Sequence, residues 1–120
     1  SQANVKLGKL STARDSAYQS AKLNPAWGKP YVLIGDMYLN SVSTCGTNVF
    51  EQGMVYSAAI DKYIKAKNID SSLREQCNKK IALYTKYLPA NNDAFFSGAK
   101  YVDVYQVGCW INETTKVRIQ

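Results

Sequence analysis

The spacing of apolar residues divides the chain into a helical part and a shorter part with a different period. Before Pro89, apolar residues recur every three or four positions, the spacing of one face of an α-helix. This spacing predicts helices at 5–23, 30–40, 49–68 and 73–88. After Pro89 the period falls to two, with β-branched and aromatic residues at 101–109 and again at 115–120. The second pattern predicts a β-hairpin that turns at 111–114.

Turn and capping residues mark the predicted helix ends. Pro25 ends the first helix, because proline disfavours α geometry in the residue before it. Residues 40–48 form a polar loop rich in turn formers. Asn48 followed by Glu51, and Ser72 followed by Glu75, are the spacings of capping boxes that start the last two helices.

Gly35 lies in the middle of a predicted helix. It falls in the helix at 30–40, where glycine is about 1 kcal/mol less favourable than alanine. A neighbouring helix that approaches closely would compensate for this cost, because glycine has no Cβ in the way. We therefore expect a close helix contact at Gly35.

Small and large residues recur between the helices in a fixed register. The first helix carries Ala13, Ala17 and Ser20, the next carries Tyr31, Ile34, Gly35 and Tyr38, and the long helix carries Ala59, Tyr63 and Ala66. This is the register of the tetratricopeptide repeat (TPR), a helical hairpin of about 34 residues that stacks into a scaffold. Here the loop at 40–48 and added helix at 49–53 lengthen the repeat. We expect a mainly α fold of TPR-like antiparallel helical hairpins in a right-handed superhelix.

The register also divides the chain. Residues 1–90 are expected to hold a half-repeat, one full repeat with the 40–48 insertion, and a capping helix at 73–88. Residues 91–120 are expected to form a C-terminal β-hairpin cap. Because an isolated hairpin is marginally stable in water, this cap must pack on the helices.

Residues 15–120 resemble the C-terminal region of TPR proteins from Bacteroidetes bacteria. The resemblance is carried by Asn24-Pro25-x-Trp27-Gly28-Lys29-Pro30-Tyr31, by Cys45-Gly46-Thr47, by Ala58-Ala59-x-Asp61-Lys62-Tyr63 and by Val107-Gly108-Cys109-Trp110-Ile111-Asn112-Glu113-Thr114-Thr115. It implies an exported protein of the periplasm or outer membrane, with further repeats upstream. It implies no established activity.

Three cysteines allow one disulfide and one free thiol. Cys77 lies on the apolar stripe of a helix and is expected to be buried. Cys45 in the inserted loop and Cys109 in the hairpin belong to elements that need anchoring, so we predict a disulfide between them. The alternative is two reduced thiols in a cytosolic protein.

The composition argues against an enzyme. The chain has no histidine, which excludes Ser-His-Asp and Cys-His catalysis and His-ligated metal sites. No cofactor or metal is expected. Asp61 is interpreted as forming an exposed ion pair on its helix with Lys62 or Lys65. The Asn112-Glu113-Thr114 triplet matches a glycosylation sequon, a pattern that occurs often by chance.

The net charge of +6 comes from lysines at helical spacing, which fits a solvated surface. An anionic polymer is the second interpretation, and nucleic acid is not expected because no binding motif accompanies the charge. No run of about 18 apolar residues predicts a membrane span.

The predicted function is a protein-interaction scaffold at the C-terminal end of a longer TPR array in the bacterial cell envelope. A protein or peptide partner would contact residues on the concave helical face: Lys29, Val32, Asp36, Leu39, Asn78, Lys79, Ala82 and Lys86. Lysine and asparagine at such positions can bind the terminal carboxylate of a peptide. The negative charge of Asp36 at the same face argues against this binding mode. Trp27 and Trp110 are interpreted as packing residues, although either could anchor a partner. The alternative is a purely structural cap without a groove ligand.

Overall fold

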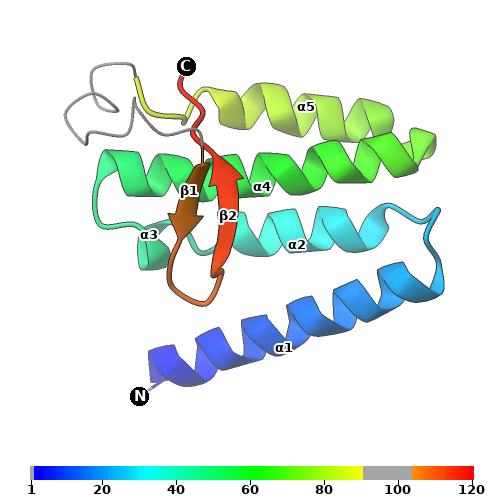
Figure 1. Ribbon diagram of the computed structural model, residues 1–120, viewed down its shortest axis with the longest axis horizontal. Helices are drawn as coiled ribbons and strands as arrows, with labels where there is room; N and C mark the ends of the chain where they lie inside the picture. Colours follow the sequence, from blue (N-terminus) through cyan, green and yellow to red (C-terminus); the bar gives the residue numbers. More distant parts are fainter. Residues whose placement is uncertain (1, 91–103) are drawn as a thin grey trace.

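The computed structural model describes residues 2–90 and 104–120, with side chains from residue 6 onward. These residues form α1 (Gln2–Leu23), α2 (Lys29–Leu39), α3 (Val42–Cys45), α4 (Val49–Ile69), α5 (Arg74–Thr85), β1 (Val104–Val107) and β2 (Glu113–Lys116), with a 3₁₀ turn at Ser71–Leu73. The four long helices lie side by side in chain order, each antiparallel to the next, and the hairpin crosses them (Figure 1). The prediction of a mainly helical chain with a C-terminal β-hairpin is confirmed.

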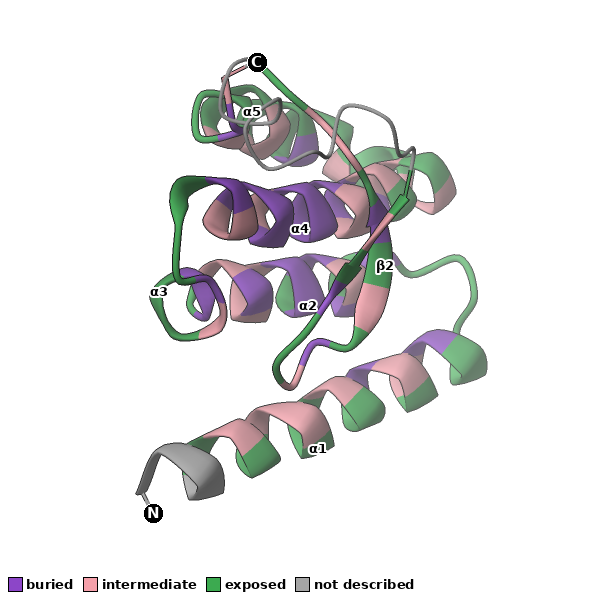
Figure 2. Ribbon diagram, turned by 60° about the vertical axis from the view of Figure 1, so that its left-hand side comes forward, coloured by how far each residue is buried: buried purple, intermediate pink, exposed green. Residues whose placement is uncertain are grey.

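The core lies between α2 and α4, the two helices with the most buried surface in Figure 2. Ile34 and Tyr38 of α2 and Met54, Ala59 and Tyr63 of α4 are each 0% exposed. The outer helices contribute less, Cys77 being the buried residue of α5. This position confirms the prediction that Cys77 is buried.

Gly35 of α2 lies against the Tyr63 side chain of α4. A Cβ on Gly35 would lie 2.7 Å from Cε1 of Tyr63, inside van der Waals contact. The missing side chain leaves room for the Tyr63 ring next to the α2 backbone. The sequence expectation of a close helix contact at Gly35 is confirmed.

The start of α4 differs slightly from a standard capping box. The Asn48 side chain accepts a hydrogen bond from the Glu51 N–H at 2.8 Å, as expected. The Glu51 carboxylate reaches one residue further back and accepts from the N–H and the hydroxyl of Thr47 at 2.9 and 2.7 Å. These bonds lower the pKa of the exposed Glu51 carboxyl. Both side chains therefore fix the start of the helix.

The last helix is not capped as the sequence indicated. Asp70, rather than Ser72, provides the cap: its carboxylate accepts from the Ser72 N–H at 3.2 Å and from the Gly28 N–H at 2.9 Å. One side chain thus caps the 3₁₀ turn and ties it to the start of α2. The regular helix also ends at Thr85, before the predicted 88. Beyond it the N–H groups of Lys86 and Leu88 donate to the carbonyls of Leu83 and Thr85, three residues earlier, so the last turn before Pro89 is tighter than an α-helix.

The predicted loop at 40–48 contains the short helix α3. The N–H groups of Cys45 and Gly46 donate to the carbonyls of Ser41 and Val42 at 2.8 and 3.0 Å. The Val42 side chain is buried. This single turn presents Cys45 toward the hairpin.

The hairpin register differs from the sequence prediction. Val107 pairs with Glu113 and Val104 with Lys116, so the connection runs through 108–112 instead of 111–114. Cys109 and Asn112 have positive φ values of 62° and 44°, and Asn112 is of a residue type that tolerates this geometry. Ile111 at the tip is 0% exposed. The turn therefore begins three residues earlier than predicted and contains a buried side chain. The alternating residues at 101–103 lie outside the described residues.

Replacing Gly35 with alanine tests the α2–α4 contact. Gly35→Ala is expected to lower the free energy of unfolding by about 1–3 kcal/mol, because overpacking at Tyr63 outweighs the gain in helix propensity. The measurement is urea unfolding followed by circular dichroism. Gly8→Ala is the matched control, since no atom lies within 4 Å of its Cβ position, and it should leave stability unchanged or raise it. Equal effects of the two changes would contradict the packing explanation.

Candidate functional site

The residues predicted for the concave face divide into accessible and buried positions on α2. Lys29 is exposed, and Asp36 and Leu39 are half-buried. Val32 is 1% exposed and packs in the apolar cluster that also contains Tyr63. The expectation that Val32 points into a groove is therefore wrong, because the packing of the neighbouring helices covers this side of α2. An apolar residue of α2 that is accessible is Leu33, at 47% exposure.

The predicted residues on α5 lie together at the surface. Asn78, Lys79 and Ala82 line a shallow depression of about 630 Å³ with residues of the preceding turn. Lys79 also lies 3.5 Å from Glu75 in an exposed ion pair, which contributes little to stability. Lys86 is exposed at the end of the helix. The depression is an open surface that a partner could contact.

Asp36 connects three helices. Its Oδ1 accepts a hydrogen bond from the Tyr63 hydroxyl at 2.6 Å and lies 3.2 Å from Nζ of Lys80. Burial, together with the Asp36 carboxylate, raises the pKa of the Tyr63 hydroxyl. Asp36 is therefore part of the α2–α4–α5 packing as well as the predicted face, and Lys80 balances its charge.

A cluster of polar interactions lies under the hairpin, around Glu113. Its carboxylate accepts hydrogen bonds from the hydroxyls of Tyr18, at 2.6 Å, and Tyr38. Nζ of Lys62 lies 3.2 Å from Oε1 in a largely buried ion pair. One side chain of β2 thereby binds α1, α2 and α4.

These contacts shift the pKa values of the groups that make them. Burial opposes ionisation of Glu113, but the hydrogen bonds from both tyrosines and the charge of Lys62 outweigh it and lower the pKa of the carboxyl. Burial also opposes the charge on Lys62, yet its contacts with Tyr18 and Glu113 raise its pKa. Both groups are therefore charged at neutral pH.

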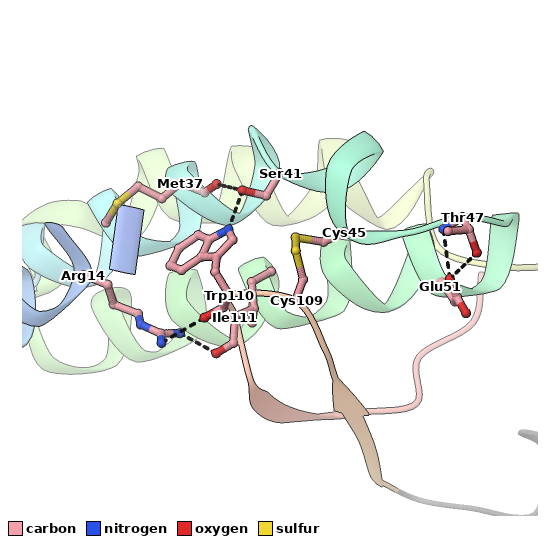
Figure 3. Close-up of a disulfide and its surroundings, with 9 residues drawn as sticks. All are labelled: Arg14, Met37, Ser41, Cys45, Thr47, Glu51, Cys109, Trp110 and Ile111. Carbon is pink, nitrogen blue, oxygen red and sulfur yellow. Dashed lines mark hydrogen bonds between the residues drawn. A yellow bond between two sulfur atoms is a disulfide. The ribbon is translucent and has the colours of Figure 1, made fainter. Parts of the chain in front are cut away.

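Arg14 of α1 holds the tip of the hairpin. Its guanidinium donates to the carbonyl oxygens of Trp110, at 3.2 Å, and Ile111 (Figure 3). It also stacks on the Trp110 ring, with Cζ 5.0 Å from the ring centroid. The planar guanidinium thus satisfies backbone acceptors in a turn that carries a buried side chain.

The two tryptophans differ in their surroundings. The Trp110 indole N–H donates to the Ser41 hydroxyl at 2.9 Å (Figure 3). Its ring packs edge-on against Tyr38. Its predicted packing role is confirmed. Trp27 is 45% exposed in the α1–α2 connection, so the prediction that it packs is wrong. It lies where the chain turns between helices and is available to a partner.

A second polar cluster fixes the end of the hairpin to α4. Arg118 Nη1 lies 2.7 Å from Asp61 Oδ1, and the Thr115 hydroxyl donates to the other carboxylate oxygen at 2.6 Å. The Ser57 hydroxyl donates to the Lys116 carbonyl at 2.7 Å. The interpretation of Asp61 as an exposed pair with Lys62 or Lys65 is therefore wrong, because its partners come from the hairpin.

A disulfide joins Cys45 of α3 to Cys109 of the hairpin, with a sequence separation of 64 (Figure 3). The predicted pairing is confirmed. Cys77 is a free, buried thiol. The disulfide and the hydrogen bonds from Arg14 thus hold the same short turn.

Sequence reasoning missed Arg14, Glu113 and Arg118, the charged groups that dock the hairpin. One signal was available: Arg14 and Tyr18 lie four residues apart on α1, so they share a helix face with each other. Their common partner could not be found without the register of β2.

Comparison of the chain with family models, with curated proteins and with solved structures gives no match. The class of protein follows from the structure itself: a helical domain whose C-terminal β-hairpin is docked on three helices. Within residues 2–90 and 104–120, acidic and cysteine side chains form no cluster suited to a metal ion. In the same ranges, no helix is long and apolar enough to cross a membrane.

The disulfide predicts both a thiol count and a stability change. Alkylation of the unfolded protein should label Cys77 alone without reductant and all three cysteines after reduction, as read by mass spectrometry. The double variant Cys45→Ser, Cys109→Ser should lose up to about 4 kcal/mol of stability, since the bond restricts a long loop in the unfolded chain. Three labelled thiols without reductant would contradict the bridge.

Glu113 predicts a pH dependence. Because its folded-state pKa lies below its unfolded value, its contribution to stability is present above the usual glutamate range and is lost as pH falls through the folded pKa. Glu113→Gln should cost roughly 2 kcal/mol at pH 7, and the difference from the parent protein should shrink in acid. Urea unfolding at several pH values measures both effects.

The matched control is Glu75→Gln, which removes the exposed carboxylate of the pair with Lys79. It should change stability little at any pH. A pH profile that Glu113→Gln leaves unaltered would show that the carboxylate does not anchor the hairpin in its charged form.

Proposed function

We propose that this domain is a protein-interaction scaffold and forms the C-terminal end of a longer TPR-type array in the bacterial cell envelope. The arrangement of α1, α2, α4 and α5 as successive antiparallel neighbours supports it (Figure 1). The observation that carries the proposal is the docking of the hairpin through Glu113 on α1, α2 and α4. The end of a helical array requires a cap, because its last repeat has no further neighbour to cover it.

The covalent anchor supports an exported location. Disulfides persist in oxidising compartments and are rare in the bacterial cytosol. The Cys45–Cys109 bond, together with the resemblance to Bacteroidetes TPR proteins, supports the cell envelope as the site of action.

The partner surface we propose lies on α2 and α5, which the Asp36–Lys80 ion pair joins. A protein or peptide would contact the accessible predicted residues: Lys29, Asp36, Leu39, Asn78, Lys79 and Lys86. Leu33 and Trp27, at 47% and 45% exposure, add the apolar contacts that protein interfaces need at their centre. Such a surface combines dispersed charge with a few exposed apolar anchors.

A purely structural cap is the second candidate, and the observation that favours it is the same docked hairpin. In this role the α2 and α5 surface would have no ligand. Binding of an anionic polymer through lysines has less support, because Lys62 and Lys80 are engaged with Glu113 and Asp36 inside the domain.

Charge-matched variants separate the three functions. Once affinity purification with the full-length protein has identified a partner, Lys29→Ala with Lys79→Ala should weaken its binding at least about tenfold, as expected when contact residues of an interface are removed. Lys9→Ala with Lys22→Ala, an equal charge change on exposed positions of α1, should leave binding unchanged. Isothermal titration measures both.

The alternatives give different results in the same experiment. Equal losses from both variant pairs, with binding that falls steeply as salt rises, would indicate an anionic polymer. Binding that neither pair alters would exclude the α2 and α5 surface and favour the structural cap.

A further inference from the structure

The α1–α2 loop, residues 23–28, carries large apolar side chains at the surface. Leu23, the last residue of α1, is 87% exposed, and Trp27 is 45% exposed. The chain turns tightly between them, with the Trp27 N–H donating to the Asn24 carbonyl at 3.0 Å, and Pro25 within the turn is exposed as well. The loop lies at one end of the helical layer (Figure 1). An aliphatic and an aromatic side chain are therefore both presented to solvent at this end of the domain.

A cavity of about 520 Å³ opens beside the α1–α2 loop. Its walls include Pro25, Tyr31 and Ile69, and two exposed lysines, Lys22 of α1 and Lys65 of α4, also line it. Among the described side chains, no carboxylate lines this cavity or forms an ion pair with either lysine. The cavity therefore combines apolar walls with two positive charges that no described carboxylate balances.

One carboxylate that lies next to the loop is already engaged. Asp70 accepts hydrogen bonds from the N–H groups of Gly28 and Ser72, at 2.9 and 3.2 Å, and from the Ser72 hydroxyl at 2.6 Å. These bonds lower the pKa of its carboxyl, so they compensate its negative charge. Asp70 thus serves the turn between α4 and α5 and does not line the cavity.

Exposed apolar side chains beside lysines are the combination that binds the surface of a membrane. Aliphatic side chains such as Leu23 gain free energy when they enter the boundary of the acyl chains. Tryptophan favours the level of the headgroups, because its ring is apolar and its indole N–H is polar. Lysines are attracted to anionic lipids. A protein interface also uses apolar anchors, but lysine is depleted there, so the loop fits a lipid surface better.

We propose that the α1–α2 loop docks this domain on an anionic membrane surface, with Leu23 and Trp27 entering the headgroup region and a lipid phosphate bound at the cavity between Lys22 and Lys65. The contact is peripheral and requires no helix that crosses the bilayer. The inference goes beyond the proposed function, because it adds a lipid surface to a domain proposed to bind a protein. Trp27 is common to both surfaces, whereas Leu23, Lys22 and Lys65 belong to the lipid surface alone.

Binding to vesicles tests the proposal. The 120-residue chain is mixed with vesicles of equal parts phosphatidylcholine and phosphatidylglycerol, and with vesicles of phosphatidylcholine alone, and cosedimentation gives both affinities. Binding should be at least about tenfold tighter on the anionic vesicles, since each lysine near such a surface contributes roughly fivefold. It should weaken as salt rises.

Trp27 reports directly on insertion. Its emission should shift to shorter wavelength on anionic vesicles, and lipids brominated near the headgroup should quench it. Trp110 packs on Tyr38 under the hairpin and should give an unchanged background.

Two sets of variants locate the contact. Leu23→Ser, and the pair Lys22→Ala with Lys65→Ala, should each weaken binding to the anionic vesicles at least about tenfold. All three side chains are exposed, so their removal takes nothing from the core. Circular dichroism confirms that each variant keeps its helices.

The matched controls change the same residue types elsewhere. Leu83→Ser removes a leucine that is 46% exposed on α5, and Lys6→Ala with Lys9→Ala makes an equal charge change at the other end of α1. Both should leave vesicle binding nearly unchanged. Neither control changes a residue of the α1–α2 loop or of its cavity.

Several outcomes would overturn the proposal. Equal affinities for neutral and anionic vesicles, or no binding to either, would exclude an anionic surface. Binding without a change in Trp27 emission would show adsorption by charge alone, and equal effects of test and control variants would place the contact elsewhere. Saturable binding of soluble glycerol phosphate without vesicle binding would make the cavity a site for a free phosphate. A protein partner lost on Leu23→Ser, again without vesicle binding, would assign the loop to that partner.

Discussion

The burial of one carboxylate organises this domain. Glu113 lies on a two-stranded hairpin that would be marginal by itself, and its charge must be compensated where it is removed from water. Tyr18, Tyr38 and Lys62 provide that compensation from α1, α2 and α4. Because the Glu113 carboxylate is compensated only when α1, α2 and α4 lie in this arrangement, it stabilises the arrangement. The position of the hairpin and the packing of the helices therefore depend on each other.

Around this carboxylate the anchors differ in kind. The Cys45–Cys109 bond restricts the unfolded chain, whereas Arg14 satisfies carbonyl groups of the folded turn. The Asp61–Arg118 pair holds the far end of the hairpin on α4. Because these contacts act on separate parts of the hairpin, it is attached along its length. Such attachment suits a permanent cap at the end of the proposed array.

The two faces of the helical layer have different characters. Glu113, Arg14 and Asp61 hold the hairpin against α1 and α4 through compensated charges. A groove between α1 and α2 and the accessible residues of α2 and α5 remain open, with apolar walls in the groove and dispersed charge on the other surface. The domain is thus covered where the hairpin lies and accessible at the α1–α2 groove and on α5.

The sequence by itself determined the local structure. The spacing of apolar residues and the turn and capping residues placed the four long helices within a few residues of their observed bounds. The position of Gly35 inside a helix predicted its close contact. The positions of Cys45 and Cys109 predicted the disulfide. These features depend on neighbours along the chain or on one steric fact. Only the tertiary structure decided that Val32 is buried, that Asp61 binds Arg118 and that Glu113 joins three helices. Each of these three contacts depends on which distant segment packs opposite the residue. In a hairpin, a shift of the register by one residue moves every side chain to the other face and changes its partners. The sequence does not show which distant residue a charged side chain will contact. Its structural role is decided only when tertiary packing brings a group of opposite charge next to it.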